Sequence, residues 1–391
     1  MKSKRKLCVV VNSRANYARI KSLLYFAKKN ANLKLQLVVG ASALLERYGN
    51  LKKILKKDGF KIDQISYTIV EGSETSTMSK SVGLGVIELT NIFKTLKPDI
   101  VLTIADRFEN LAVAIASSYL NICLAHTQGG ETTGSIDESV RHAITKLSHL
   151  HFPSTKRSNQ FLINMGEDPK KIFNVGCPSM DIINFKNLKK KNFNLNKFGV
   201  GHIINIKNPY IVVLFHPDTT EILKLENQID VLIKSVYEFS EENNSQVVWF
   251  WPNIDAGSDK ISSYLRKFRE KFPKQKIRFI VNLEPEDYLK VIYECKVIVG
   301  NSSSGIREAS FMGIPSVNVG LRQNNREKYL NVKDSDFDVK KLKKIILLQF
   351  KKGRYKKSNL YGTGNAGKKI IDILGKVDLS IKKELNYLKR Y

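Results

Sequence analysis

The sequence predicts an α/β protein made of two Rossmann-like, doubly wound domains with a central cleft. Short runs rich in β-branched residues alternate with segments whose apolar residues recur at helical spacing. This alternation is typical of parallel sheets whose strands are joined by helices. It occurs twice along the chain, and 391 residues are enough for two separate cores.

The first half predicts a domain over residues 1–183, which we expect to carry the acid and base groups of a site. A helix is predicted over 16–30, directly after the first strand. The predicted strands of this half are 6–13, 33–40, 66–70, 99–105, 122–128 and 172–177, with a further strand flanked by His149 and His151.

The second half begins after a polar stretch rich in Asn and Lys, residues 184–208, which has no clear period and predicts a linker. Residues 209–391 then predict a nucleotide-binding domain that ends in helices with a basic surface. Its predicted strands are 210–217, 246–252, 277–281, 296–303 and 314–320.

Composition excludes several classes of protein. A hydrophobic content of 42% and a charged content of 26% are typical of a globular protein, and no apolar run reaches the length of a membrane helix. The apolar run after the basic start is too short for a secretion signal, so we expect a cytoplasmic protein with no membrane partner. The four cysteines form no CxxC pair, which predicts reduced, buried thiols rather than a zinc site.

The net charge of +28 raises the possibility of a nucleic-acid partner. However, the excess is mostly lysine spread over several predicted helices and loops, without arginine clusters or an aromatic-studded stripe. We therefore expect no nucleic-acid binding. A positive field of this size favours an anionic substrate, such as a nucleotide sugar.

Polar residues follow almost every predicted strand, and ligands of open parallel sheets bind at these strand ends. The stretch GNSSSGIREAS places Ser302 and Ser303 between a strand and a helix, where backbone N–H groups suit a phosphate. Glu308 lies further along and suits a ribose hydroxyl pair. Arg322 in GLRQNNRE and Arg14 in NSRANYAR suit a diphosphate. Helix capping and solvated arginines are the alternative interpretations.

Two further strand ends carry candidates. His216 in HPDTTE can donate to a phosphate or act as a general acid, although a histidine before proline is often structural. Asn253 and Asp255 in WPNIDAGSD can hydrogen-bond a base, sugar or ribose. Because the dinucleotide motif GxGxxG is missing after the first strand, we do not expect a nicotinamide or flavin cofactor.

Three carboxylates predict acid/base chemistry. Asp106 follows one strand, and Glu131 and Asp137 follow the next, so all three should meet at one wall of the cleft. Neighbouring carboxylates repel one another and raise at least one pKa, which suits proton transfer. Asp137 and Arg141 stand four residues apart on a predicted helix, which favours an ion pair. A metal site from His126, Glu131 and His142 matches no zinc spacing.

Together, these motifs resemble the hydrolysing UDP-N-acetylglucosamine 2-epimerases of the sialic-acid pathway over roughly residues 6–375. The motifs that carry the resemblance are SRANY, ADRFE, GGETTGSIDESVRHAITKLSHLHF, VGCPSMD, HPDTTE, PNIDAGS and GNSSSGIREASFMGIPSVNVGLRQ. The resemblance implies a GT-B fold, a homodimer or homotetramer, and no metal or redox cofactor. It also implies elimination of UDP from UDP-N-acetylglucosamine, followed by hydration of the glycal to N-acetylmannosamine.

The resemblance also implies roles for individual residues. Asp106 and Asp137 take the places of the family's acid/base carboxylates, and His216 that of its catalytic histidine. The implied nucleotide contacts are Arg14, Asn253, Asp255, Ser302, Ser303, Glu308 and Arg322.

One position departs from the family pattern. Gln128 stands in HTQGG where the sialic-acid enzymes carry Glu, and an amide can hydrogen-bond but cannot transfer a proton in this way. Either another group such as Glu131 takes that role, or the substrate is a nucleotide-linked 2,4-diacetamido-2,4,6-trideoxyhexose of a legionaminic-type pathway. UDP-N-acetylglucosamine is the expected substrate. A GT-B glycosyltransferase and a nucleotide-sugar sensor without turnover are further alternatives.

Overall fold

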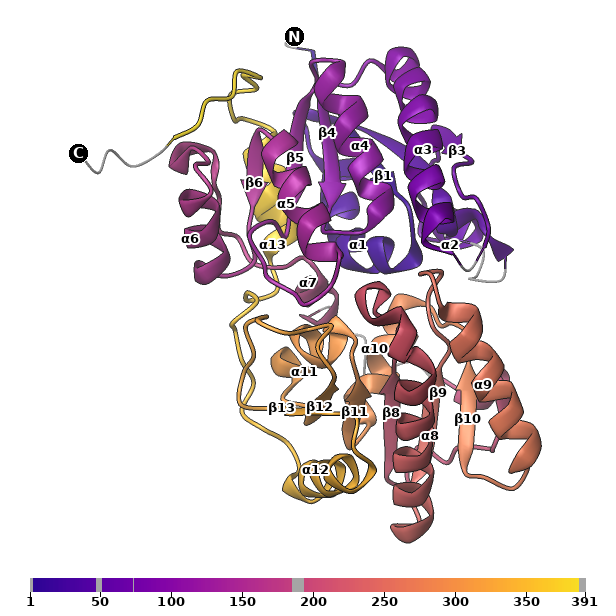
Figure 1. The fold of residues 1–391 in the computed structure, drawn as a ribbon. Helices are drawn as coiled ribbons and strands as arrows, with labels where there is room; N and C mark the ends of the chain where they lie inside the picture. The colour runs from indigo at the N-terminus through magenta and orange to yellow at the C-terminus, as the bar shows by residue number, and fades with distance from the viewer. Residues whose placement is uncertain (1–2, 47–50, 73, 185–192, 387–391) are drawn as a thin grey trace.

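Two α/β domains lie one above the other in the computed structural model, which describes residues 3–46, 51–72, 74–184 and 193–386. The carboxyl ends of the strands in both sheets face the junction between the domains (Figure 1). Both predicted Rossmann-like units are therefore present, and they face each other across a shared cleft.

The N-terminal sheet has, among the described residues, six parallel strands in the order β3-β2-β1-β4-β5-β6. Helices α1 and α13 pack on one face of this sheet, and α3, α4 and α5 pack on the other. The strands are β1 (Arg5–Val11), β2 (Leu33–Gly40), β3 (Gln64–Ser66), β4 (Ile100–Ile104), β5 (Cys123–Thr127) and β6 (Leu150–Phe152). The helices are α1 (Arg14–Lys29), α2 (Leu51–Lys57), α3 (Thr75–Leu96), α4 (Phe108–Tyr119), α5 (Asp137–Leu147), α6 (Lys156–Asn164), α7 (Ser179–Asn184) and α13 (Ala366–Leu374).

The C-terminal sheet has, in the described part of the chain, seven strands in the order β13-β12-β11-β8-β9-β10-β7, with β7 antiparallel to β10 and the rest parallel. Helices α8, α9 and α12 cover one face, and α10 and α11 cover the other. The strands are β7 (Val200–Gly201), β8 (Tyr210–Leu214), β9 (Gln246–Phe250), β10 (Ile277–Ile280), β11 (Val297–Gly300), β12 (Ser316–Val319) and β13 (Val332–Ser335). The helices are α8 (Leu225–Glu242), α9 (Ser258–Lys271), α10 (Pro285–Glu294), α11 (Arg307–Met312) and α12 (Val339–Lys352).

Two predicted strands of the first half differ in the structure. The strand expected over 66–70 ends at Ser66, because β2 turns away after Gly40 and leaves the edge strand without a partner. The strand expected over 172–177 is absent from the described sheet. Gly176 (φ +91°) instead brings this segment against the backbone of Gly362, where an added Cβ would lie 2.8 Å from the Gly362 Cα. The sixth strand is β6, which lies at His149 and His151, where the sequence also predicts a strand.

The expected linker over 184–208 needs correction. Residues 185–192 lie outside the described residues. The second part of the stretch belongs to the C-terminal domain, since Leu195 and Ile204 are buried in its core and β7 pairs with β10.

The C-terminal helix α13 departs from the predicted division at residue 209. Its buried residues Ile370, Ile371 and Leu374 belong to the apolar core of the N-terminal sheet, beside Ile20 and Leu23 of α1. Figure 1 shows this yellow helix within the upper domain. An amphipathic helix does not encode which core it will cover, so its position could not be read from its own pattern.

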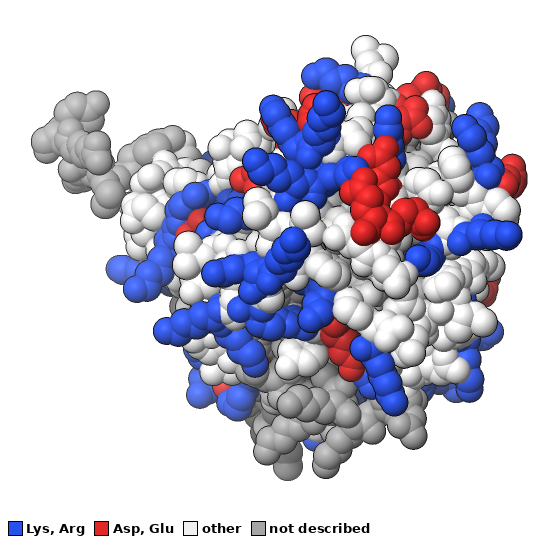
Figure 2. All heavy atoms as spheres, turned by 90° about the horizontal axis from the view of Figure 1, so that it is seen from below, with Lys and Arg blue, Asp and Glu red and all other residues white. Residues whose placement is uncertain are grey.

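The surface is strongly basic. Seen from below, Lys and Arg side chains are spread over the described part of the face, with uncharged residues and several smaller acidic groups between them (Figure 2). Cys8, Cys123, Cys177 and Cys295 are free thiols, and all four are buried as expected. Within the described ranges, none of the helices combines the length and the apolar character that crossing a bilayer requires.

The packing of α13 generates a first prediction. Ile371 is 1% exposed, so Ile371→Ala should destabilise the N-terminal domain by about 2–5 kcal/mol through lost burial and a residual cavity. Leu348→Ala, on the exposed face of α12 where Leu348 is 59% exposed, should change stability by less than about 0.5 kcal/mol. Hydrogen exchange read by mass spectrometry should show faster exchange in β1 and β2 of the Ile371 variant. Faster exchange in β8 and β9 alone would contradict this packing.

Candidate active site

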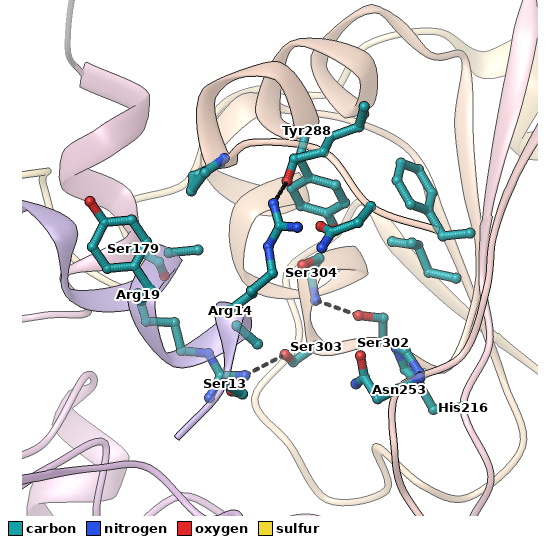
Figure 3. Close-up of a pocket in the computed structure, with 18 of the residues that line it drawn as sticks. Ser13, Arg14, Arg19, Ser179, His216, Asn253, Tyr288, Ser302, Ser303 and Ser304 are labelled. Carbon is teal, nitrogen blue, oxygen red and sulfur yellow. Dashed lines mark hydrogen bonds between the residues drawn. The ribbon is translucent and has the colours of Figure 1, made fainter. Parts of the chain in front are cut away.

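A cavity of about 260 Å³ lies between the two domains at the carboxyl ends of the strands (Figure 3). Both domains line it, so neither could form it alone. Nine predicted site residues are among its lining residues: Arg14, Asp106, Asp137, His216, Asn253, Ser302, Ser303, Glu308 and Arg322.

The turn between β1 and α1 brings two arginines into the cavity. Ser13 caps α1 by accepting from the Asn16 N–H, which fixes the first turn of the helix. Arg14 donates to the Leu283 carbonyl at 2.8 Å, and burial lowers its pKa to about 10 although Glu284 opposes the shift. Arg19, one helical turn further, donates to the Ser303 hydroxyl at 3.2 Å (Figure 3).

Asp106 lies directly after β4 and is surrounded by cations. It accepts a short hydrogen bond from Arg141, and Arg326 and Arg19 lie 3.8 and 4.0 Å from its carboxylate oxygens. Burial acts to raise the pKa of Asp106, but these three arginines hold it well below its usual range. Asp106 therefore stays ionised at neutral pH.

Asp137 begins α5, and its pKa is shifted in the opposite direction to that of Asp106. Burial and the nearby charge of Asp106 raise its pKa to about 6, against the attraction of Arg322 at 3.4 Å. The ion pair predicted between Asp137 and Arg141 is wrong, because Arg141 binds the Asp106 carboxylate and Asp137 pairs with Arg322. A carboxyl group that titrates near neutrality can both accept and donate a proton during a reaction.

His216 follows β8 and is held by Asn301. The Asn301 side chain accepts from the His216 N–H and donates to the His216 carbonyl, each at 2.8 Å. The Nδ1 atom accepts from the Asn253 N–H at 3.4 Å, which assigns the ring proton to Nε2. Burial first, and then Arg322 and Arg107, lower the pKa of His216 to about 3. At neutral pH the ring is a neutral N–H donor.

The loop after β11 supplies serine hydroxyls. Gly300 (φ +134°) passes so close to β8 that an added Cβ would lie 2.1 Å from the Leu214 carbonyl oxygen, which only glycine permits. The chain then presents Ser302, Ser303 and Ser304 to the cavity (Figure 3). Glu308 on α11 also lines it. Hydroxyls and backbone N–H groups beside Arg19 form a setting suited to a phosphate.

Asp255 is placed differently from the prediction. It is not among the described residues that line the cavity, and it forms an ion pair with Arg107 at 3.0 Å. Arg107 does line the cavity and also pairs with Glu109 at 3.1 Å. The sequence therefore predicts a direct ligand contact where the structure shows a carboxylate that orients an arginine.

Gln128 and Glu131 also lie apart from the described lining residues. Gln128 accepts from Arg307 at 2.6 Å and donates to the Cys177 sulfur at 3.4 Å. Glu131 pairs with Arg307 and, at 3.4 Å, with Arg326. Burial opposes ionisation of Glu131, but these arginines keep its pKa below its usual range. Both residues therefore lie at the contact between the domains, where they bind arginines of the C-terminal domain.

Sequence reasoning missed several residues that line the cavity. Arg107 stands beside Asp106 in the motif ADRFEN, and Ser179 lies in VGCPSMD, so both motifs contained a signal. Arg19 and Tyr288 lie inside helices, and only their position on the cavity side identifies them. Among the residues that the structure describes, no three His, Cys, Asp or Glu side chains are grouped as metal ligands would be.

Two Rossmann-like domains that enclose a ligand cavity define a GT-B fold. The same fold is found in the UDP-GlcNAc 2-epimerase of Methanocaldococcus jannaschii, solved in complex with UDP-GlcNAc and UDP. That structure matches with a TM-score of 0.78 at 18% identity, over 94% of this chain and 99% of that one.

Sequence comparison identifies the family. The family described as UDP-N-acetylglucosamine 2-epimerase matches residues 27–375. The UDP-N,N'-diacetylbacillosamine 2-epimerase (hydrolyzing) of Legionella pneumophila is 33% identical, over 96% of this chain and 97% of the relative. The GDP/UDP-N,N'-diacetylbacillosamine 2-epimerase (hydrolyzing) of Campylobacter jejuni is 32% identical, over 86% and 85%. The chain belongs to the UDP-N-acetylglucosamine 2-epimerase family.

The environment of Asp137 generates a second prediction. Its carboxyl group should titrate with a midpoint of about 6. Because the positive charge of Arg322 lowers this pKa, Arg322→Gln should raise the midpoint and Arg322→Lys should change it less. Carboxyl ¹³C NMR of aspartate-labelled protein measures the titration directly. A wild-type midpoint near 4 would contradict the described environment.

Proposed function

We propose that the protein is a hydrolysing 2-epimerase that acts on a UDP-linked 2-acetamido-2-deoxyhexose and releases UDP and the C2-epimeric free sugar. The observation that carries the proposal is the pairing of Asp106 and Asp137 in one cavity, one held ionised and the other with a pKa of about 6. Carboxyl groups whose pKa values are pushed apart can take different roles in proton transfer.

The proposed reaction has two steps. In the first, a carboxylate removes the proton at C2 while the bond between C1 and the diphosphate oxygen breaks, which gives a glycal and UDP. In the second, water adds its oxygen to C1, and a proton returns to C2 on the opposite face. Asp137 suits the proton transfer at C2, because its pKa lies near neutrality.

The remaining lining residues suit the charge that develops on the leaving diphosphate. Arg19 donates to the Ser303 hydroxyl at 3.2 Å and lies 4.0 Å from the Asp106 carboxylate, so it links the serine loop to this carboxylate. The neutral ring of His216 offers an Nε2–H donor, and Arg322 adds a positive charge. Donors arranged before the reaction stabilise such charge without reorganisation. The negative charge of ionised Asp106 also favours the protonated form of Asp137.

Two sugars are candidates. UDP-N-acetylglucosamine is the substrate that the sequence predicts from its family resemblance. UDP-N,N'-diacetylbacillosamine gains support from the two relatives above, which carry its name and match 86% and 96% of this chain. Gln128 accommodates either sugar in this proposal, because it lies in the contact between the domains and is held there by Arg307.

A third prediction distinguishes these substrates and the competing functions. The protein is incubated in D₂O with each UDP-sugar in turn, and with the GDP-linked diacetyl sugar, and products are followed by proton NMR. We expect free sugar of inverted C2 configuration, deuterated at C2, and free nucleotide without any acceptor. Transfer only to an added acceptor would indicate a glycosyltransferase. UDP binding without turnover of any of the three sugars would indicate a sensor.

A fourth prediction tests the two carboxylates. Asp106→Asn and Asp137→Asn should each lower kcat by about 10²–10⁴-fold, because each loses an acid/base or charge-bearing group. UDP affinity, measured by calorimetry, should stay within a few-fold of the wild type. Arg14→Ala is the matched contrast, since it should weaken UDP binding through the loss of a cavity cation. Full activity of either Asn variant would remove that residue from the mechanism.

A further inference from the structure

The turn that presents Asp106 contains an unusual backbone conformation. Ala105, directly before Asp106, has φ +59°, in the left-handed region that residues other than glycine seldom adopt. Such a conformation persists only where neighbouring groups hold it, and it recurs at functional sites. The groups that hold Ala105 therefore determine where the Asp106 carboxylate lies.

Strand β5 binds both polar backbone atoms of Ala105. The Ala105 N–H donates to the Thr127 carbonyl at 3.1 Å. On the other side, the Nε2 atom of His126 lies 2.8 Å from the Ala105 carbonyl oxygen. A carbonyl oxygen can only accept, so Nε2 must carry the ring proton. His126 is 0% exposed, so this contact lies away from bulk solvent.

The other nitrogen of His126 is held by α5. Its Nδ1 lies 3.2 Å from the Thr145 hydroxyl, and because Nε2 carries the proton, this hydroxyl is the donor. Burial first, and then the charges of His151 and Arg141, lower the pKa of His126 to about 3. The ring is therefore neutral, and the Ala105 carbonyl fixes its tautomer, while Thr145 holds Nδ1.

Helix α5 links these contacts to the rest of the site. Asp137, Arg141 and Thr145 stand four residues apart and share one face of the helix. Asp137 lines the cavity, Arg141 binds the Asp106 carboxylate, and Thr145 reaches Asp106 indirectly, through His126 and the Ala105 carbonyl. One helix face thus sets both carboxylates relative to each other.

We propose that His126 and Thr145 are positioning residues for Asp106, which act by holding the left-handed Ala105 turn against β5. This inference rests on the proposed function for its link to turnover. The contacts themselves exist whatever the substrate, so a readout without turnover tests them as well.

Two matched pairs of variants test the proposal. His126→Gln keeps an N–H donor near the position of Nε2, whereas His126→Leu removes it at similar volume. Thr145→Ser keeps the hydroxyl, whereas Thr145→Val removes it with the same shape. If His126→Leu does not fold, the milder Thr145 pair still decides the question.

Turnover should respond through kcat. We expect kcat of His126→Leu to fall about 10- to 100-fold, the size of effect that a small misplacement of a reacting group produces. Thr145→Val should lose about three- to tenfold, as expected for one hydrogen bond. KM and UDP affinity should stay within about threefold of the wild type. The Gln and Ser variants should retain most of the wild-type kcat, because each keeps the hydrogen bond that its partner variant loses. Equal losses in both members of a pair, or a loss confined to KM, would overturn the proposal.

The titration of Asp137 gives a readout that does not need turnover. The charged groups facing Asp137 are Asp106, Arg322, Asp255 and Arg107, and Asp106 is the strongest of those that raise its pKa. When the Ala105 turn relaxes and Asp106 moves away, the Asp137 midpoint should fall in His126→Leu and remain in His126→Gln. An unchanged midpoint in the Leu variant would overturn the proposal even if no sugar is turned over.

The tautomer of His126 can be observed directly. In ¹⁵N-histidine-labelled protein, the signal that disappears in His126→Gln belongs to this residue. It should show a protonated Nε2 and a bare Nδ1 from pH 5 to 8, without titration. A protonated Nδ1, or a titration within that range, would overturn the proposal.

Discussion

The buried contact between Arg141 and Asp106 is the interaction on which the geometry of the site depends. Arg141 is 0% exposed, and its second nitrogen donates to the Glu131 carbonyl at 2.7 Å. One guanidinium thereby fixes the end of β4 and the loop after β5 against α5. Breaking a buried pair of this kind leaves an uncompensated charge, which costs about 3–5 kcal/mol. The position of α5, and with it Asp137, follows from this constraint.

Cations from both domains surround the cavity, and most of them are engaged by groups across the cleft. Arg14 and Arg19 reach from the N-terminal domain to Leu283 and Ser303, and Arg107 reaches to Asp255. Arg322 and Arg307 reach in the other direction, to Asp137 and Glu131. Charged contacts of this kind are typical of interfaces between domains that retain some freedom. A diphosphate that binds among these arginines would contact guanidinium groups whose orientation is already fixed by these contacts.

The sequence allowed the fold class and nine of the cavity-lining residues to be predicted, because polar residues after parallel strands must converge at one edge of a sheet. Asp137 illustrates where the local pattern failed. The four-residue spacing permits an ion pair between Asp137 and Arg141. However, the end of β4 brings Asp106 to the Arg141 guanidinium, and a contact between such distant segments cannot be predicted from local spacing.

Gln128 and Glu131 illustrate a second limit. Their motif marks the region correctly, yet their side chains meet Arg307 of the other domain, and a pattern along one strand carries no information about that partner. The short strand β7, of two residues, holds too few side chains for a period to be recognised. The sequence pattern therefore predicted the location of the site more reliably than the orientation of each side chain.

The position of α13 makes the C-terminal domain an insertion within the N-terminal one. The first sheet obtains part of its core from Ile370, Ile371 and Leu374, about 330 residues after β2 along the chain. During synthesis, the domain that emerges first therefore lacks part of its apolar cover until α13 has left the ribosome. The second domain has its sheet and helices complete by Lys352, so it can reach its final packing before the first does. The N-terminal sheet therefore depends for part of its core on a helix that is translated after the whole inserted sheet.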